Sequence, residues 1–165
     1  MAVPAQRLTA RLHLSAPRLE DAPALFAFMG DAEVMRNTYR QASSRSMRRH
    51  LAGHSWQARR LGFGCWTVRH EGRIVGFGGL NDDPFDPGYG PEVAYFFARD
   101  AWGQGFAGEL MAASLAEARR VGLTVVRGFV HPQNGASRRV LERAGFVVER
   151  WVPEMDRWVL RLEIT

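Results

Sequence analysis

Three closely spaced glycines, Gly103, Gly105 and Gly108, stand between a strand-like run and the strongest amphipathic helix of the chain. Glycine adopts left-handed backbone angles without steric cost, and the first N–H groups of a helix have no partners within that helix. The turn can therefore point several backbone donors and the positive end of the helix dipole at one anion, such as a pyrophosphate. The residues of this predicted anion site are Gly103, Gln104, Gly105, Phe106, Ala107 and Gly108.

The runs around this turn predict one mixed α/β domain that covers residues 1–165. Strand periodicity is found over residues 8–14, 65–69, 74–80, 92–98, 125–130, 146–152 and 157–164. Helical periodicity is found over residues 20–29, 46–61, 107–121 and 134–144. The three strand-like runs just before the glycine turn are separated by turn-forming residues, which favours an antiparallel meander.

The composition is typical of a globular protein and argues against a membrane-spanning, disulfide-rich or metal-binding one. The 165 residues are 46 % hydrophobic, which is enough to bury one core, and no apolar stretch approaches membrane-spanning length. The single cysteine, Cys65, fits a reducing compartment, and we expect a cytoplasmic protein. The apolar neighbours of Cys65 favour a buried thiol over a covalent nucleophile assisted by His70. The five histidines lack the spacing of metal ligands, so no metal site is predicted.

The basic residues favour an anionic ligand over an anionic polymer. All 22 are arginine, against 17 acidic residues, which gives a formal net charge of +5. They are scattered along the chain, so a phosphate-bearing cofactor is expected and direct binding to nucleic acid is not.

The three glycines also satisfy the G-x-G-x-x-G pattern of dinucleotide-binding proteins. That pattern needs an acidic residue about 20 positions later for the ribose. No Asp or Glu lies between Glu117 and Glu142, although Arg127 could bind the extra phosphate of NADP. An NADP-dependent oxidoreductase is thus an alternative, and the meander and the late position of the turn argue against it.

Two sequence blocks in register resemble a single family. Residues 92–109, EVAYFFARDAWGQGFAGE, resemble the cofactor-binding motif of the Gcn5-related N-acetyltransferase (GNAT) superfamily, and residues 131–146, HPQNGASRRVLERAGF, resemble its second block. The N-terminal portion, including Asp21, Leu25 and residues 33–35, is similar to the branch that acetylates the N-termini of ribosomal proteins. The positions that depart from the family pattern are Ala94 for a common Gly, Arg99 for a common Pro, and Leu141 for a tyrosine that acts as general acid in many members.

This resemblance implies a twisted, mostly antiparallel mixed sheet flanked by helices, with splayed central strands that hold acetyl-CoA. It also implies that the pantetheine pairs with backbone near Phe96, Phe97 and Ala98, and that an N–H group there, at Phe96 or a neighbour, binds the oxyanion. Both expectations extend the predicted anion site along the preceding strand.

The catalytic groups follow from the same resemblance. Glu92 matches a glutamate of the family and heads the strand that would line the acetyl group, so it is the predicted general base. Asn134 and Ser137 match positions that face the cofactor, although both can also be explained as helix-capping residues. Ser137 is the candidate proton donor to the CoA thiolate, because Leu141 cannot serve.

Acidic residues in two loops are the only sequence clue to the acceptor, and they are Asp82, Asp83, Asp86, Glu154 and Asp156. An acidic rim attracts a cationic amine, and a peptide α-amine, with a pKa of about 8 against about 10.4 for lysine, is far more often neutral at pH 7. We therefore predict a peptide or protein N-terminus, ribosomal or other, as the acceptor. A polyamine or antibiotic-like amine and a non-catalytic CoA-binding module are the alternatives, and a homodimer is left open.

Overall fold

The computed structural model describes residues 6–82 and 88–165. The strands are β1 (Arg7–Leu8), β2 (Leu12–Ser15), β3 (Cys65–His70), β4 (Arg73–Asn81), β5 (Glu92–Phe97), β6 (Val125–Val130), β7 (Val147–Val152) and β8 (Arg157–Glu163). The helices are α1 (Ala22–Met29), α2 (Ser44–Leu61), α3 (Phe106–Arg120) and α4 (Gly135–Arg143), with 3-10 turns η1 (Leu19–Asp21) and η2 (Arg99–Ala101).

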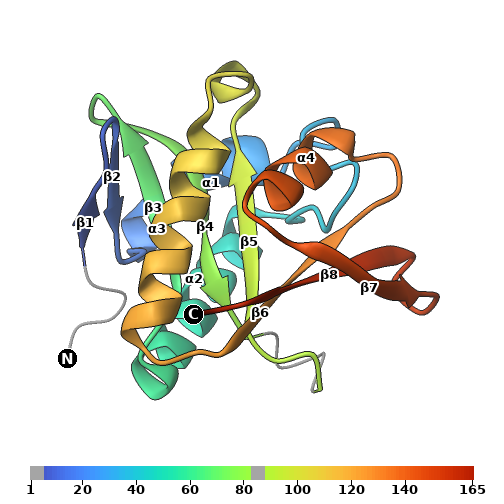
Figure 1. Ribbon diagram of the computed structural model, residues 1–165. Helices are drawn as coiled ribbons and strands as arrows, with labels where there is room; N and C mark the ends of the chain where they lie inside the picture. Colours follow the sequence, from blue (N-terminus) through green and yellow to red (C-terminus); the bar gives the residue numbers. More distant parts are fainter. Residues whose placement is uncertain (1–5, 83–87) are drawn as a thin grey trace.

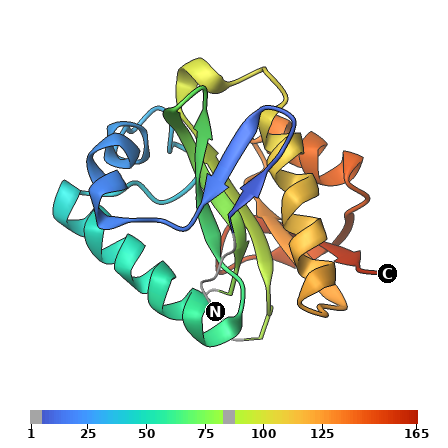
Figure 2. The same cartoon turned by 90° about the vertical axis from the view of Figure 1, so that its left-hand side faces the viewer.

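The strands form one eight-stranded sheet in the order β1-β2-β3-β4-β5-β6-β8-β7. Helices α1 and α2 cover one face of the sheet and α3 and α4 cover the other, as Figures 1 and 2 show. All neighbouring strands in these residues are antiparallel except β5 and β6. The predicted mixed α/β fold with a meander before the glycine turn is thus confirmed.

The N-terminal run that was predicted as one strand is a tight hairpin, so that prediction is wrong. The chain reverses after Thr9, whose N–H donates to the Leu12 carbonyl at 2.9 Å while its hydroxyl oxygen accepts from the Leu12 N–H at 3.0 Å. Leu8 is exposed, whereas Leu12 and Leu14 are buried in β2. The reversal explains why the leucines do not alternate regularly along the sequence.

Helix α2 is fixed at both ends by local sequence. Ser46 donates its N–H to the Ser43 hydroxyl at 3.0 Å and the Ser43 N–H donates to the Ser46 hydroxyl at 3.1 Å, a reciprocal cap of the first turn. Gly62 ends the helix with a left-handed φ of 84°. The fully buried residues of α2 are Met47, Leu51 and Ala58.

The centre of the sheet opens between β5 and β6. Within the described residues these parallel strands pair at one position, Glu92 opposite Arg127. On its other side β5 pairs with β4 along its whole length, and β6 pairs with β8 along its whole length. The two strands therefore diverge from the Glu92–Arg127 pair (Figure 1), which is the splayed arrangement that the sequence predicts.

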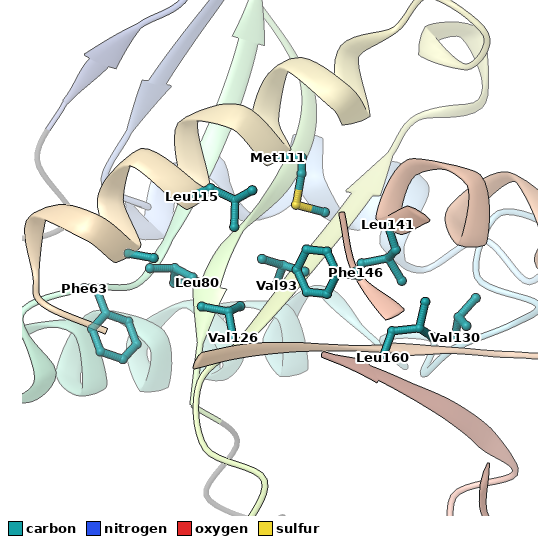
Figure 3. Close-up of a cluster of buried hydrophobic side chains, with 11 residues drawn as sticks. Phe63, Leu80, Val93, Met111, Leu115, Val126, Val130, Leu141, Phe146 and Leu160 are labelled. Carbon is teal, nitrogen blue, oxygen red and sulfur yellow. The ribbon is translucent and has the colours of Figure 1, made fainter. Parts of the chain in front are cut away.

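A hydrophobic cluster joins α3 and α4 to the strands on both sides of this opening. Figure 3 shows Met111 and Leu115 of α3, Val93 of β5 and Leu141 of α4 pointing toward one another. Gly128 of β6 makes room for Leu141, because a Cβ atom at position 128 would lie 2.6 Å from Leu141 Cδ2. One packed core thus contacts both of the diverging strands.

None of the helices in residues 6–82 and 88–165 is long and apolar enough to cross a bilayer.

Candidate active site

The glycine turn between β5 and α3 has the backbone geometry of an anion site. Gly103 and Gly105 adopt left-handed φ angles of 74° and 82°, and Gly105 is the N-cap residue of α3. The turn is exposed, and added Cβ atoms at Gly103 and Gly108 would meet no other group within 4 Å. An added Cβ at Gly105 would lie 3.3 Å from Arg11 Nη2, so a guanidinium is also near the turn. Exposed glycines at a helix start beside a guanidinium are suited to a phosphate, so the residues present fit the pyrophosphate of acetyl-CoA.

The N-terminal hairpin supports this turn from behind. Arg11 donates from its Nη1 to the Gln104 carbonyl at 2.8 Å, and its guanidinium lies 4.7 Å from the centre of the Phe106 ring. Glu109, in the first turn of α3, accepts from the Arg11 N–H at 2.7 Å and from Arg11 Nε at 2.9 Å, and it also bonds the Thr9 hydroxyl. Glu109 therefore has a structural explanation, since it anchors the hairpin against the helix start.

Two hydrogen bonds establish which backbone groups of β5 face the opening. The Ala98 N–H donates to the Val75 carbonyl of β4 at 2.9 Å, and the Pro91 carbonyl accepts from the Arg127 N–H of β6 at 3.0 Å. Backbone groups along an antiparallel strand point alternately to the two neighbouring strands. Even-numbered residues of β5 therefore point their N–H groups toward β4, and odd-numbered residues point theirs toward the opening.

This alternation corrects part of the predicted cofactor contacts. Of the three residues expected to pair with pantetheine, Phe96 and Ala98 direct their N–H groups at β4, whereas Phe97 directs its N–H at the opening. The Phe97 carbonyl already accepts from the Trp102 indole N–H at 2.8 Å. The backbone N–H groups that face the opening are those of Val93, Tyr95 and Phe97. The predicted oxyanion donor at Phe96 or a neighbour therefore fits only as a neighbour, Tyr95 or Phe97.

Glu92 lies at the closed end of the opening. It is half-buried, and Asn81 Nδ2 of β4 donates to its Oε1 at 3.4 Å. Its charge contributes to a raised pKa of the Cys65 thiol, although burial of that thiol is the larger cause. Cys65 packs with Phe77 in the cluster beneath α1 and α2, so the Glu92 carboxylate belongs to the α2 side of the sheet.

A hydroxyl pair that the sequence did not identify bridges the opening on the other face. The Tyr95 hydroxyl of β5 lies 2.8 Å from Ser137 Oγ of α4 and donates to the Ser137 carbonyl at 3.2 Å. Burial raises the pKa of Tyr95 to about 12, against a smaller opposing effect of the Ser137 hydrogen bond. The phenol therefore stays protonated through neutral pH. Tyr95 lies within the matched motif, but only the three-dimensional fold brings it to α4.

The remaining cofactor candidates on α4 have mainly local contacts. Asn134 Oδ1 accepts from the Ser137 N–H at 3.1 Å, which is the helix cap expected from sequence. Leu141 is fully buried in the core beside Phe146, so it faces the hydrophobic cluster and not the opening.

Two histidines on the inner surface of α2 pack against Phe77 of β4. His54 Nε2 lies 3.1 Å from His50 Nε2, and both rings pack against Phe77, with centroid distances of 5.1 Å for His54 and 5.8 Å for His50. Burial lowers the pKa of His54 to about 3, with a smaller contribution from His50, and burial also lowers the pKa of His50. Both imidazoles are therefore neutral at pH 7, and Phe77 connects them to its cross-strand partner Phe96 on β5.

The two acidic segments predicted to line the acceptor pocket occupy different parts of the sheet. Asp82 directly follows Asn81, the cross-strand partner of Glu92, and the Asp82 carbonyl accepts from the Gln57 side chain. Glu154 and Asp156 lie in the β7–β8 hairpin, where Val130, the last residue of β6, pairs with Trp158. Asp83 and Asp86 lie outside the described residues. Asp82 thus borders the closed end of the opening and the hairpin borders its wide end.

A contact between distant segments borders the wide end. Arg157 Nη2 of the hairpin donates to the Asn37 carbonyl of the α1–α2 loop at 2.7 Å. His131 Nε2 lies 3.9 Å from Asp156 Oδ2 in the same region. The loop and the hairpin together therefore border the opening opposite the glycine turn.

The acetyltransferase (GNAT) domain family matches residues 11–147 of the chain. The chain belongs to this family. As a GNAT acetyltransferase it uses acetyl-CoA as its acetyl donor, in agreement with the fit of the glycine turn to a pyrophosphate.

Solved GNAT structures share the whole fold. A putative GNAT-family acetyltransferase from Bordetella pertussis is 25 % identical, with a TM-score of 0.82 over 98 % of this chain and 99 % of that one. RimL, the ribosomal L7/L12 alpha-N-protein acetyltransferase, in complex with coenzyme A, is 18 % identical, with a TM-score of 0.81 over 96 % of this chain and 97 % of that one. YncA from Salmonella typhimurium, a putative acetyltransferase with acetyl-CoA, is 21 % identical, with a TM-score of 0.75 over 94 % and 95 %. No curated protein sequence matches significantly.

Membership of the GNAT family overturns the NADP alternative, and the geometry gives the physical reason. The Arg127 guanidinium bonds Glu149 at 2.8 Å and the Tyr89 carbonyl at 2.6 Å. It is also at the closed end of the opening, at the opposite end of β5 from the glycine turn. Within the described part of the chain, no group of three or more His, Cys, Asp or Glu side chains is placed to hold a metal ion.

Proposed function

We propose that this GNAT acetyltransferase acetylates the α-amine of a peptide or protein N-terminus, by direct attack of the amine on acetyl-CoA with Glu92 as the general base. The observation that carries the proposal is the arrangement around β5. Glu92 lies on the α2 face at the closed end of the opening, and the Tyr95–Ser137 hydroxyl pair bridges the opening on the α4 face.

This arrangement separates the two proton transfers. Residues 92 and 95 are an odd number of positions apart on one strand, so their side chains point to opposite faces of the sheet. The amine approaches from the α2 face and gives its extra proton to Glu92 as the new C–N bond forms. The C–S bond then breaks, and the thiolate takes a proton from the hydroxyl pair.

Tyr95 is the better placed of the two hydroxyls to deliver that proton. It is buried and keeps its proton at neutral pH, and its hydrogen bond to Ser137 orients it across the opening. Ser137 would then position the phenol and share its proton. The N–H groups of Val93, Tyr95 and Phe97 are the candidate donors to the oxyanion.

Two considerations support an N-terminal acceptor over a lysine side chain. An α-amine has a pKa of about 8, so near neutral pH a far larger share of it is already unprotonated than of a lysine amine with a pKa of about 10.4. RimL, an acetyltransferase for a ribosomal protein N-terminus, has the same fold over nearly the whole chain. Asp82, Asp83, Asp86, Glu154 and Asp156 remain the proposed acidic residues that attract the cationic acceptor.

Release of free thiol from acetyl-CoA tests the proposal. Three acceptors are compared at pH 7: a peptide with a free N-terminus, the same peptide with a blocked N-terminus and an internal lysine, and a polyamine. We expect the free N-terminus to react fastest. Glu92→Gln should lower turnover by about 100-fold with little change in acetyl-CoA affinity, and this loss should shrink as the pH rises. The control is Glu163→Gln, which alters an exposed carboxylate at the end of β8.

The other outcomes identify the competing functions. Faster reaction of the blocked, lysine-containing peptide or of the polyamine would contradict an N-terminal acceptor and favour a lysine or a small-molecule amine. Binding of acetyl-CoA with no thiol release for any amine would indicate a non-catalytic CoA-binding module. Wild-type turnover in the Glu92→Gln variant would contradict only the general-base role of Glu92 and would leave the choice of acceptor unaffected.

A further inference from the structure

Helix α2 carries the whole formal charge excess of the protein. Its 18 residues include Arg45, Arg48, Arg49, Arg59 and Arg60 and no acidic residue. The full chain has 22 basic and 17 acidic residues, so the chain without these five arginines has 17 charges of each sign. The positive field that was expected to serve a phosphate-bearing cofactor is therefore concentrated on one helix, on the opposite face of the sheet from the glycine turn.

These arginines are exposed and have no acidic partner. Among the described residues, no carboxylate lies within ion-pair distance of any of the five. Of the 17 arginines elsewhere in the chain, 11 form an ion pair with a carboxylate, for example Arg127 with Glu149 and Arg120 with Glu117. Since a guanidinium binds a carboxylate in a bidentate way, unpaired arginines on a rigid helix are suited to an external anionic partner.

The helical period places these five arginines on one face of α2, which we call the arginine ridge. At about 100° per residue they fall within an arc of about 120°, with Arg45 at its centre, Arg49 and Arg60 at one side and Arg48 and Arg59 at the other. The rise of about 1.5 Å per residue makes this arginine ridge about 22 Å long. Figure 2 shows α2 on the outside of the molecule, on the other side of the sheet from α3.

The ridge combines charged and apolar side chains, as protein–protein contact surfaces do. Arg45, Arg48 and Arg49 line a shallow open groove together with Leu19 and Ala52, and Leu19 is 46 % exposed. Exposed apolar groups between guanidinium groups suit the side chains of a polypeptide better than a row of phosphates. The Trp56 ring is 59 % exposed, but the Arg60 guanidinium covers one of its faces at 5.1 Å, which limits its use for stacking on bases.

The ridge lies on the acceptor side of the active site. The inner face of α2 packs through His50 and His54 on Phe77, the cross-strand partner of Phe96, and Gln57 bonds the Asp82 carbonyl beside Glu92. A molecule bound to α2 is thus on the same face of the sheet as the Glu92 carboxylate. The cofactor turn at the start of α3 stays uncovered.

We propose that the arginine ridge of α2 docks an acidic surface on the body of a protein acceptor while its N-terminus enters the opening between β5 and β6. This inference rests on the proposed function and extends it from a peptide to a folded acidic protein. The ridge acts through charge, so it raises the rate of productive encounter for an acidic acceptor and does nothing for a short neutral peptide.

The test uses one N-terminal sequence in three contexts: the best peptide acceptor alone, fused to an acidic carrier domain, and fused to a neutral carrier domain. The variant is Arg48→Gln with Arg49→Gln. The matched control is Arg119→Gln with Arg143→Gln, which removes two exposed charges from α3 and α4. We expect the wild-type enzyme to have a higher kcat/KM for the acidic fusion than for the other two acceptors. On the acidic fusion the double variant should lose about tenfold in kcat/KM, and added salt should cause a similar loss for the wild type. Peptide and neutral fusion should be unchanged.

Two results would overturn the docking surface: an equal loss on all three acceptors, or an undiminished kcat/KM for the acidic fusion. A third result would contradict an acidic protein as the partner and indicate a nucleic acid instead. In that result an RNA oligonucleotide binds more tightly than the acidic carrier, and its binding is lost in the Arg48/Arg49 variant. Failure of the proposed function is distinguishable, because no acceptor would then react. Binding of the acidic carrier protein to the acetyl-CoA-loaded enzyme, measured at low salt, would still report on the ridge.

Discussion

The glycine turn and the Tyr95–Ser137 pair serve the same opening but are built in different ways. The turn consists of consecutive residues, 103–108, and presents backbone N–H groups whose direction depends on local φ angles. The hydroxyl pair joins side chains that are 42 positions apart, on β5 and α4. The proposed cofactor end of the site is therefore a property of a short segment, whereas the proposed catalytic end exists only when the two halves of the sheet are assembled.

This difference predicts how each end responds to substitution. The turn depends on the absence of side chains, so it should fail when bulk and charge are added. The hydroxyl pair depends on the presence of particular atoms, so it should fail when one oxygen is removed. The first kind of change should abolish cofactor binding, and the second should slow the reaction without affecting binding.

The largest effect is expected from Gly105→Glu. The variant puts a carboxylate where N–H groups converge at the start of α3, and it forces a left-handed φ of 82° on a residue with a side chain. For the wild type, acetyl-CoA at 100 times its Kd should stabilise the native state by about 2.7 kcal/mol, which is a Tm increase of about 5–10 °C. The variant should show no increase in a thermal shift assay.

Gly122→Glu is the matched control at the other end of α3. Gly122 is exposed, has a left-handed φ of 77°, and an added Cβ would meet nothing within 4 Å. This variant carries the same backbone strain and charge away from the proposed cradle, so it should keep the full acetyl-CoA shift. A full shift in Gly105→Glu as well would rule out the turn as the pyrophosphate site.

The same contrast explains how far the sequence could predict this protein. Periodicity identified the meander, α3 and the glycine turn, because each depends on neighbouring residues. It missed the reversal at Thr9, where a side-chain hydroxyl replaces a backbone partner. It also could not tell which N–H groups of β5 face the opening, since that orientation is set by pairing with β4.

Long-range contacts carry the rest of what the sequence did not predict. Tyr95 stood within a matched motif without an assigned role, because its partner on α4 is far away in the chain. The acidic residues were grouped by composition, yet Asp82 and the β7–β8 hairpin lie at different ends of the opening. The arginines read as scattered in sequence, whereas helical geometry aligns five of them on α2.

A smaller effect is expected at the hydroxyl pair. Tyr95→Phe should lower kcat by about tenfold, near the low end of general acid effects, because a thiolate is already a good leaving group. The KM for acetyl-CoA should change little. Ser137→Ala should cost less, because Tyr95 can still donate to the carbonyl of residue 137 at 3.2 Å. Steady-state rates across pH 6–9 measure both variants.

The ranking of the two variants separates two roles. A larger loss for Ser137→Ala than for Tyr95→Phe would make Ser137 the donor and Tyr95 its positioning residue. Equal wild-type rates in both variants would show that the thiolate leaves without a proton from either hydroxyl. The pKa of about 12 for Tyr95 also implies that wild-type activity has no loss from phenol ionisation below pH 10.

The smallest effect concerns stability on the acceptor side, where α2 rests on two neutral imidazoles. Burial lowers the pKa of His54 to about 3, whereas in the unfolded chain a histidine titrates at about 6.5. At pH 7 both states are neutral and the shift has no effect. Below about pH 6.5 His54 binds a proton in the unfolded chain but stays neutral in the native state. The free energy of unfolding therefore falls as the pH falls toward the native pKa. Between pH 6.5 and 5 this linkage should cost about 1.6 kcal/mol for His54. The His54→Gln variant has no titrating group at this position, and its amide can keep a hydrogen bond to His50. Its free energy of unfolding should therefore fall less steeply than that of the wild type over this range, with a difference in slope of up to about 1.4 kcal/mol per pH unit.

Urea unfolding at pH 7, 6 and 5 measures the difference. Identical slopes for variant and wild type would mean that the native protein protonates His54, and that α2 is not held on the sheet by a neutral imidazole.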